Sequence, residues 1–168
     1  MNQECRALDN PSPSQLNHGT MQIRQAGETD HEWAAQLMAS NEPWVTLRRD
    51  LQSCLAAVRR PGTELFIIRE GEQQMGFVLL AEHGLAGSPY IASIAVTEAA
   101  RGHGIGSELL RFAEARYRNL HRHIFLLVSS FNLHARRLYE QHGYRQVGEI
   151  PDYVVSGHSE IIMHKRLE

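Results

Sequence analysis

A glycine-rich turn at residues 101–107, Arg-Gly-His-Gly-Ile-Gly-Ser, has the composition of an anion-binding site. Glycine lets backbone N–H groups come close to a ligand because it has no Cβ. The residues that follow carry apolar side chains at helical spacing, so the turn is expected to lead into a helix. The first N–H groups of a helix lack intrahelical acceptors, and the helix dipole adds partial positive charge there. The turn is therefore predicted to hold an anion, and a phosphate group fits best.

Two well-known phosphate-binding motifs do not fit this turn. A Walker loop requires Gly-Lys-Ser/Thr, whereas the single lysine of the chain is Lys165. A dinucleotide-binding fingerprint would require a third glycine in place of Ser107 and an acidic residue near Val128–Ser130, where none occurs. A third pattern, Arg/Gln-x-x-Gly-x-Gly/Ala, is matched from Arg101 to Gly106. A glycine turn that caps an ordinary helix and binds nothing is the alternative interpretation.

A second stretch, Asn132–Tyr144, follows a predicted apolar strand and also matches a recognisable pattern. The pattern is Asn-x-x-Ala-x-x-Leu/Phe-Tyr-x-x-x-Gly-Phe/Tyr, and the chain has Asn-Leu-His-Ala-Arg-Arg-Leu-Tyr-Glu-Gln-His-Gly-Tyr. The two motifs, in this order, resemble those of the GNAT superfamily, the acetyl-CoA-dependent N-acyltransferases. The resemblance covers about residues 21–166, which is nearly the whole chain.

The resemblance implies that acetyl-CoA is the co-substrate. It also implies that acetyl-CoA is held by residues 94–96, by residues 101–107 and by Asn132. The pantetheine would pair along a strand like an added strand. A strand N–H there would also be placed to meet the oxyanion. Asn132 would contact the cofactor, although an asparagine at this place is also a good helix N-cap. The residues assigned to pantetheine are Ile94, Ala95 and Val96, and those around the pyrophosphate are Arg101, Gly102, His103, Gly104, Ile105, Gly106 and Ser107.

Acetyl transfer to an amine also requires a thiolate that can leave and an amine that has lost its proton. The resemblance assigns the general acid to Tyr139, with a core tyrosine as the alternative. An alkylammonium has a pKa of about 10.4, so a base is needed at neutral pH. The ribosomal N-terminal acetyltransferase branch of the superfamily places a glutamate where this chain has Leu127. The base is therefore left open. Four side chains are candidates, although each is first interpreted as an ordinary surface polar residue: His83, Asp152, His158 and Glu160. Ser93 is too weak a base alone but could hold a water molecule.

The acceptor site is expected, from the resemblance, near the first two helices and the last hairpin. Trp44, Tyr153 and His158 are candidates for its lining, whereas Trp33 is assigned to the core. For the 3′-phosphate of CoA there are three candidates that could instead form a solvated helix face: His134, Arg136 and Arg137.

The predicted function is that of an N-acetyltransferase. It would move an acetyl group from acetyl-CoA to a primary amine of a small molecule or peptide, by direct attack in a ternary complex. A CoA-binding sensor or structural homologue without turnover is the main alternative. A nucleotide-binding module unrelated to CoA is the third.

Alternating and helical apolar patterns predict a single α/β domain. Helices between strands favour parallel pairing and hairpins favour antiparallel pairing, so a mixed, mainly antiparallel sheet of about seven strands with helices on both faces is expected. The order resembles the GNAT fold, in which two central parallel strands, here 91–96 and 124–129, splay apart. The predicted strands are 21–25, 64–69, 75–83, 90–96, 124–129, 144–149 and 153–162, and the predicted helices are 28–40, 47–58, 105–119 and 133–141.

Capping and turn signals refine two of these elements. Thr46 is the predicted N-cap of the second helix, with Leu47 and Leu51 in its buried stripe. The last strand, 153–162, is long and apolar, and an exposed edge of that kind tends to pair with another chain. We therefore predict a homodimer.

Length and composition restrict the remaining possibilities. The chain has 168 residues, 42% of them hydrophobic and 21% charged, which suits one globular domain. A net charge of −2 gives no case for nucleic-acid binding. Neither a secretory signal nor a membrane span is recognisable, so the cytoplasm is expected. No spacing of its ten histidines matches a metal signature. Residues 1–20 are predicted to be a disordered leader to a single domain at 21–166.

Overall fold

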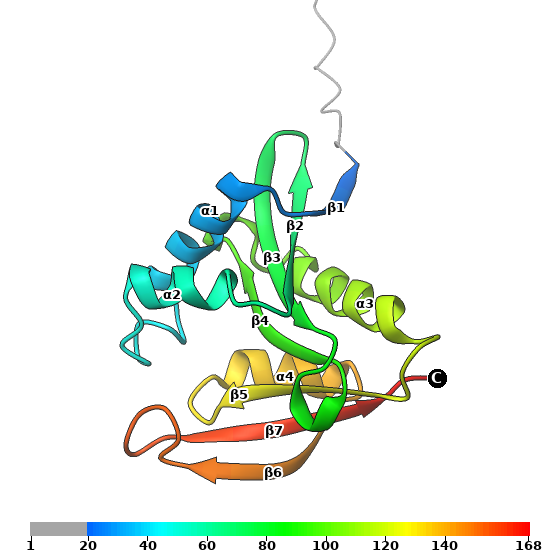
Figure 1. Cartoon of the computed structure of the whole chain (residues 1–168). Helices are drawn as coiled ribbons and strands as arrows, with labels where there is room; N and C mark the ends of the chain where they lie inside the picture. Colours follow the sequence, from blue (N-terminus) through cyan, green and yellow to red (C-terminus); the bar gives the residue numbers. More distant parts are fainter. Residues whose placement is uncertain (1–19) are drawn as a thin grey trace, which may run out of the picture.

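The structure is a computed structural model that describes residues 20–168 (Figure 1). The predicted leader therefore lies almost wholly outside the described residues. The element order is the one that the sequence predicts. The strands are β1 (Met21–Gln25), β2 (Thr63–Glu70), β3 (Gln73–Ala81), β4 (Tyr90–Val96), β5 (His123–Ser129), β6 (Arg145–Pro151) and β7 (Ser159–Arg166). The helices are α1 (Glu28–Ala39), α2 (Leu51–Val58), α3 (Ile105–Tyr117) and α4 (Leu133–Gln141), with 3₁₀ turns η1 (Leu85–Gly87) and η2 (Glu98–Ala100).

The strands form one seven-stranded sheet in the order β1-β2-β3-β4-β5-β7-β6. Every neighbouring pair is antiparallel except β4 and β5, which run parallel. This parallel pairing is short: it joins Tyr90 to Phe125 and Ile91 to Leu126, and then ends. The two central strands thus separate over the rest of their length, which confirms the predicted mixed sheet with splayed parallel strands.

Helices cover both faces of the sheet, as Figure 1 shows. On one face, α1 and α2 pack through Ala34, Met38 and Cys54 onto β2 and β3. On the other face, α3 and α4 share a core with β4, β5 and β7. The buried side of α3 consists of residues at helical spacing, each at most 2% exposed: Ile105, Leu109, Leu110, Ala113 and Tyr117. This anchorage fixes the N-terminus of α3 beside the C-terminal end of β4.

The second helix starts later than predicted. Arg48 has a φ of 54°, a left-handed conformation that a continuing right-handed helix cannot include. The helix begins at Leu51, and its N-cap is Asp50, whose carboxylate accepts a hydrogen bond from the Ser53 N–H at 2.8 Å. The predicted N-cap Thr46 instead donates to the Glu42 carboxylate at 3.0 Å. Leu51 is 43% exposed, so its assignment to the buried stripe was wrong.

The last strand also differs from the prediction. It begins at Ser159, because a turn precedes it in which Asp152 accepts a hydrogen bond from the Gly157 N–H at 2.6 Å. It lies between β5 and β6, so it is an interior strand and not an edge. The edge argument for a homodimer is therefore wrong, and the homodimer itself stays a prediction. Between residues 20 and 168, no helix combines the length and the apolar character needed to cross a membrane.

Candidate functional site

The turn into α3 presents a run of unsatisfied backbone donors. The first main-chain hydrogen bond of the helix runs from the Glu108 N–H to the Gly104 carbonyl at 3.0 Å. The six preceding N–H groups, those of residues 102–107, have no acceptor among residues 20–168. Residues 102–104 of this run are exposed, Gly106 and Ser107 are half-buried, and Ile105 is buried. Six adjacent amides at a positive helix end form the cradle for an anion that the glycines predict.

The glycines of the cradle serve two different purposes. Gly102 and Gly104 have φ angles of 78° and 79°, which favour glycine strongly, and a Cβ on either would meet no atom of residues 20–168 within 4 Å beyond its chain neighbours. Gly106 is required for packing, since a Cβ there would lie 3.0 Å from Cδ2 of Leu138 on α4. The first two glycines therefore shape the cradle, and the third brings α3 and α4 together.

The side chains of the cradle form hydrogen bonds with neighbouring parts of the chain. The Arg101 guanidinium donates to Oδ1 of Asn41, just beyond α1, at 2.7 Å. Nδ1 of His103 lies 2.9 Å from the Arg101 carbonyl oxygen. Oγ of Ser107 lies 2.9 Å from Nε2 of His142, whose pKa is lowered by burial, so this imidazole is neutral near pH 7. Arg101 is thus placed beside the amides, although its side chain is engaged with α1.

The edge of β4 that faces β5 is free beyond Ile91. Ile94, Ala95 and Val96 pair with residues 76–78 of β3 on one side and have no strand partner on the other within the described chain. The register between β3 and β4 also shifts at Ala92, because Leu79 opposes Ser93 while Leu80 opposes Ile91. A bulge of this kind re-aims the backbone groups around it. The free edge offers main-chain groups to an extended ligand, as the pantetheine assignment requires.

Tyr139 lies inside the core that α4 shares with the sheet. It is 6% exposed, and its ring packs edge-to-face against Tyr144 at a centroid distance of 6.1 Å. Burial, with a smaller contribution from Tyr90, holds the pKa of Tyr139 far above its usual value. Its hydroxyl donates to no residue between 20 and 168. The side chain thus packs in the core, and its hydroxyl makes no hydrogen bond to the described residues, which is compatible with both predicted roles.

The candidate bases differ sharply in environment. Oγ of Ser93 donates to the Ala92 carbonyl at 2.8 Å, and His158 packs against the Phe131 ring at 4.8 Å. His83 and Asp152 are exposed. Glu160 is only 7% exposed, so its description as an ordinary surface residue was wrong.

Asn132 acts as the N-cap of α4, since its Oδ1 accepts from the Ala135 N–H at 3.2 Å. Among the 3′-phosphate candidates, Arg136 is engaged with Glu140 at 3.0 Å and with Gln146 at 3.1 Å. His134 and Arg137 are exposed on the same helix. The solvated helix face is therefore the better description of Arg136.

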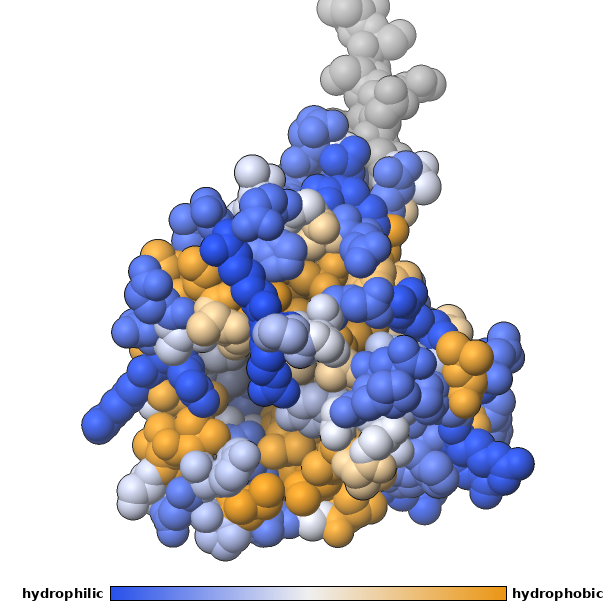
Figure 2. Space-filling model, in the orientation of Figure 1, coloured by the Kyte–Doolittle hydropathy of each residue, from blue (hydrophilic) through white to orange (hydrophobic). Residues whose placement is uncertain are grey.

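A hollow of ≈ 560 Å³ lies where the acceptor was expected, between the α1–α2 connection and the β6–β7 loop. In Figure 2 this surface is indented between the part formed by α1 and α2 and the part formed by β6 and β7. Tyr153 lines it, whereas Trp44 and His158 do not. Trp33 packs edge-to-face on Phe77 at 6.4 Å, which confirms its place in the core.

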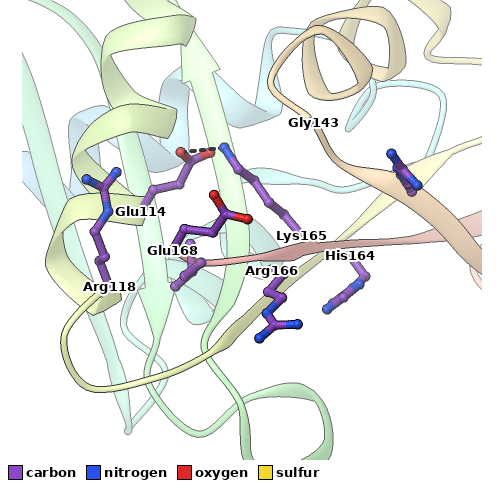
Figure 3. Close-up of a pocket in the computed structure, with 9 residues that line it drawn as sticks. Glu114, Arg118, Gly143, His164, Lys165, Arg166 and Glu168 are labelled. Atoms are coloured by element: carbon purple, nitrogen blue, oxygen red, sulfur yellow. Dashed lines mark hydrogen bonds and ion pairs between the residues drawn. The ribbon is translucent and has the colours of Figure 1, made fainter.

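A larger hollow, of ≈ 720 Å³, lies at the opposite end of α3. Figure 3 shows Lys165 reaching across it to Glu114, at 2.7 Å, with Arg118 and Glu168 nearby. It includes none of the cradle, the β4 edge or Tyr139. Size alone would select this hollow, whereas the unsatisfied amides favour the other end of the helix as the candidate site. Across the described residues, no three His, Cys, Asp or Glu side chains are grouped to hold a metal ion.

An amide cradle at a helix N-terminus beside two separating parallel strands is the arrangement that the GNAT resemblance predicts. The model of the acetyltransferase (GNAT) family matches residues 24–144, so the chain belongs to this family. An uncharacterized N-acetyltransferase of Methanocaldococcus jannaschii is 39% identical over 82 residues. Those residues are 48% of this chain and 53% of the relative, so the match spans about half of the relative's length.

Solved structures show the same fold at low identity. A Desulfovibrio desulfuricans protein assigned to the GNAT family has a TM-score of 0.75 at 17% identity, over 89% of this chain and all of its own. The ribosomal-protein-S18-alanine N-acetyltransferase of Escherichia coli has a TM-score of 0.70 at 18% identity, over 89% and 95%. An aminoglycoside 6′-N-acetyltransferase solved with coenzyme A has a TM-score of 0.71 at 15% identity, over 87% and 97%.

Proposed function

We propose that the protein transfers an acetyl group from acetyl-CoA to a primary amine of a small molecule or peptide, by direct attack in a ternary complex in the cytoplasm. The observation that carries this proposal is the run of six unsatisfied amides at residues 102–107 beside the free edge of β4. Phosphate oxygens would satisfy the amides, and an extended amide-containing arm would satisfy the strand edge. Acetyl-CoA carries both groups.

The acyl group would lie where β4 and β5 separate, because the two binding features converge there. A backbone N–H near the bulge at Ala92 would donate to the carbonyl oxygen as negative charge develops on it. Tyr139 would reach the departing sulfur from α4. Because its pKa is raised far above that of a thiol, about 8.5, Tyr139 would stabilise the thiolate chiefly by donating a hydrogen bond.

The amine would enter from the hollow that Tyr153 lines. The structural neighbours named above act on a protein alanine and on an aminoglycoside, so the fold serves both peptide and small-molecule amines. The hollow is open and partly polar, with Arg48, Arg49 and Asp50 at its wall. Peptide amines and small-molecule amines are therefore both proposed acceptors.

The test is thiol release from acetyl-CoA in the presence of defined amines: spermidine, a peptide with a free N-terminal alanine, and an aminoglycoside. Amine-dependent release is the expected result. Thermal-shift titrations with acetyl-CoA, NAD and ATP form the companion experiment, and only acetyl-CoA should raise the melting temperature. Stabilisation by acetyl-CoA without release for any amine would favour the non-catalytic CoA sensor. No stabilisation by acetyl-CoA would overturn the proposal.

A further inference from the structure

The structure contains a buried carboxylate that no cation neutralises. Glu160 on β7 is 7% exposed and forms no ion pair with any residue between 20 and 168. Within residues 20–168, the one hydrogen bond to its carboxylate comes from the Ser129 hydroxyl, which donates to Oε1 at 2.6 Å. Oε2 has no partner among the described residues, and it is not among the side-chain oxygens sealed from solvent. An unpaired buried carboxylate costs stability, so its presence calls for a functional explanation.

Glu160 lies near the place where β4 and β5 separate, which is where the acyl group is proposed to bind. Side chains alternate along a strand, and Ser129 opposes Glu160 across β5 and β7. On β5, Phe125 and Ser129 share a face, and Tyr90 of β4 lies beside Phe125. Tyr90, Ser129 and Glu160 therefore lie on the face that α1 and α2 cover. Tyr139 belongs to α4 on the opposite face. The carboxylate and the Tyr139 hydroxyl thus approach the separating strands from opposite sides.

Electrostatics support this proximity. Burial raises the pKa of Tyr90 to about 12, and the negative charge of Glu160 is the next contribution to this rise. Arg60 and Tyr153 also face Tyr90, whereas no charged side chain contributes to the pKa of Glu160 itself. Burial raises the pKa of Glu160, and the Ser129 hydrogen bond partly opposes this rise. A carboxylate of raised pKa is a stronger base.

Building on the proposed function, we propose that Glu160 is the general base of the acetyl transfer, with Ser129 as the residue that positions its carboxylate. The ammonium of the acceptor would dock against Oε2, which satisfies the buried charge, and would transfer one proton to it. This assigns the base to β7 and explains how the chain functions with Leu127 at the position where a related branch has glutamate.

The step balances as follows. The ammonium gives one proton to Glu160, and the neutral nitrogen attacks the thioester carbon, so that a C–N bond forms. The C–S bond then breaks, and the thiolate leaves with its electron pair. The nitrogen loses a second proton as the amide forms, and the thiolate takes up one proton to become the free thiol. Glu160 releases its proton to solvent, so the net reaction converts R–NH₃⁺ and the thioester into the amide, the free thiol and one proton, and no oxidant or reductant is needed.

The experiment is the pH dependence of kcat/KM, measured with the amine of the panel that reacts fastest. Wild-type kcat/KM should fall on the acid side as Glu160 becomes protonated. Glu160→Gln should lower kcat about 10²- to 10⁴-fold and remove this acid limb, while acetyl-CoA affinity by calorimetry is unchanged. Ser129→Ala removes the hydrogen bond that lowers the pKa, so its acid limb should move to higher pH with the plateau rate largely kept.

Controls separate this inference from the proposed function. Glu149→Gln removes the same charge from an exposed position on β6 and should leave every parameter unchanged. Thermal unfolding provides a test that needs no acceptor. Because burial disfavours the ionised form of Glu160 in the folded protein, Glu160→Gln should have a higher melting temperature than wild type at pH 8. The difference in melting temperature should decrease as the pH is lowered and Glu160 becomes protonated. Failure of wild type to bind acetyl-CoA would overturn the proposed function.

Three results would overturn the role of Glu160 alone while acetyl-CoA binding stays intact. The first is a Glu160→Gln enzyme with wild-type kcat and an intact acid limb. The second is a rise in the KM for the amine with kcat unchanged, which would make Glu160 a docking group only. The third is a melting gap between the two proteins that does not depend on pH.

Discussion

Substitution of Gly104 by alanine would test the anion-binding role of the cradle, with Gly62→Ala as a matched control. Gly104 has a φ of 79°, and a Cβ there meets nothing within 4 Å, so the folded-state cost is backbone strain of about 1–2 kcal/mol. Gly62, in the turn before β2, has a φ of 81° and the same open surroundings. Both variants should therefore lose about 1–2 kcal/mol, or about 2–8 °C in melting temperature.

Ligand binding should distinguish the two variants. Acetyl-CoA at 100 times its Kd should stabilise wild type and Gly62→Ala by about 2.7 kcal/mol, which is about 5–11 °C. In Gly104→Ala, relaxation of the strained φ would turn amides of residues 102–107 away from the anion. Loss of one charge-assisted hydrogen bond, about 1.5–3 kcal/mol, lowers affinity about 10- to 100-fold. At an affinity 10- to 100-fold lower, the same acetyl-CoA concentration would stabilise by only about 0.4–1.4 kcal/mol.

The assay is thermal unfolding of the three proteins with and without acetyl-CoA, supported by calorimetric titration. The bulkier Gly104→Val should abolish binding, since a branched side chain would occupy the space of the anion. Equal ligand-induced shifts in the Gly104→Ala and Gly62→Ala proteins would contradict this prediction, because the amides of residues 102–107 would then bind the ligand as well without glycine at position 104.

Three further predictions follow from single contacts. Tyr139→Phe should slow the chemical step about 10²-fold in single-turnover experiments, with acetyl-CoA affinity and melting temperature nearly unchanged; an unchanged step would leave it a packing residue. Asn132→Ala should cost about 1 kcal/mol in urea unfolding, because α4 loses its N-cap. The Arg24 hydrogen bond lowers the pKa of Asp30, so the stability advantage of wild type over Asp30→Asn should hold at neutral pH and disappear as pH falls below about 3.8; a constant gap would contradict it.

The elements with strong local signals were predictable from the sequence. β4 and α4 have the predicted bounds, because an apolar β-branched run and a helix bracketed by Asn132 and Gly143 are defined by neighbouring residues. The start of α2 and the start of β7 were not, since each depends on turn geometry. Arg48 adopts a left-handed conformation that arginine rarely adopts and that its residue type does not predict. The turn that contains Asp152 replaces residues 153–158, which were predicted to be strand.

The cradle was predictable for the same reason, since glycines act through their own backbone. Glu160 was among the candidate bases, but its burial was not predictable, because its hydrogen-bond partner Ser129 lies on β5, 31 residues away in the sequence. One feature of the sequence does indicate burial: Glu160 directly precedes the apolar run Ile161–Met163. In the structure this run belongs to β7, an interior strand of the sheet. Alternation along the strand places Glu160 on the face opposite Ile161, but nothing local shows that this face is enclosed as well.

The most direct test of the central claim is the set of backbone amide resonances that move when acetyl-CoA is added to the ¹⁵N-labelled protein. The account predicts that the largest changes fall on residues 102–107 and on Ile94–Val96, with smaller changes along α3. Changes concentrated instead around Arg118, Lys165 and Glu168, at the larger hollow, would contradict the claim that the cradle and the free edge of β4 hold the acyl donor.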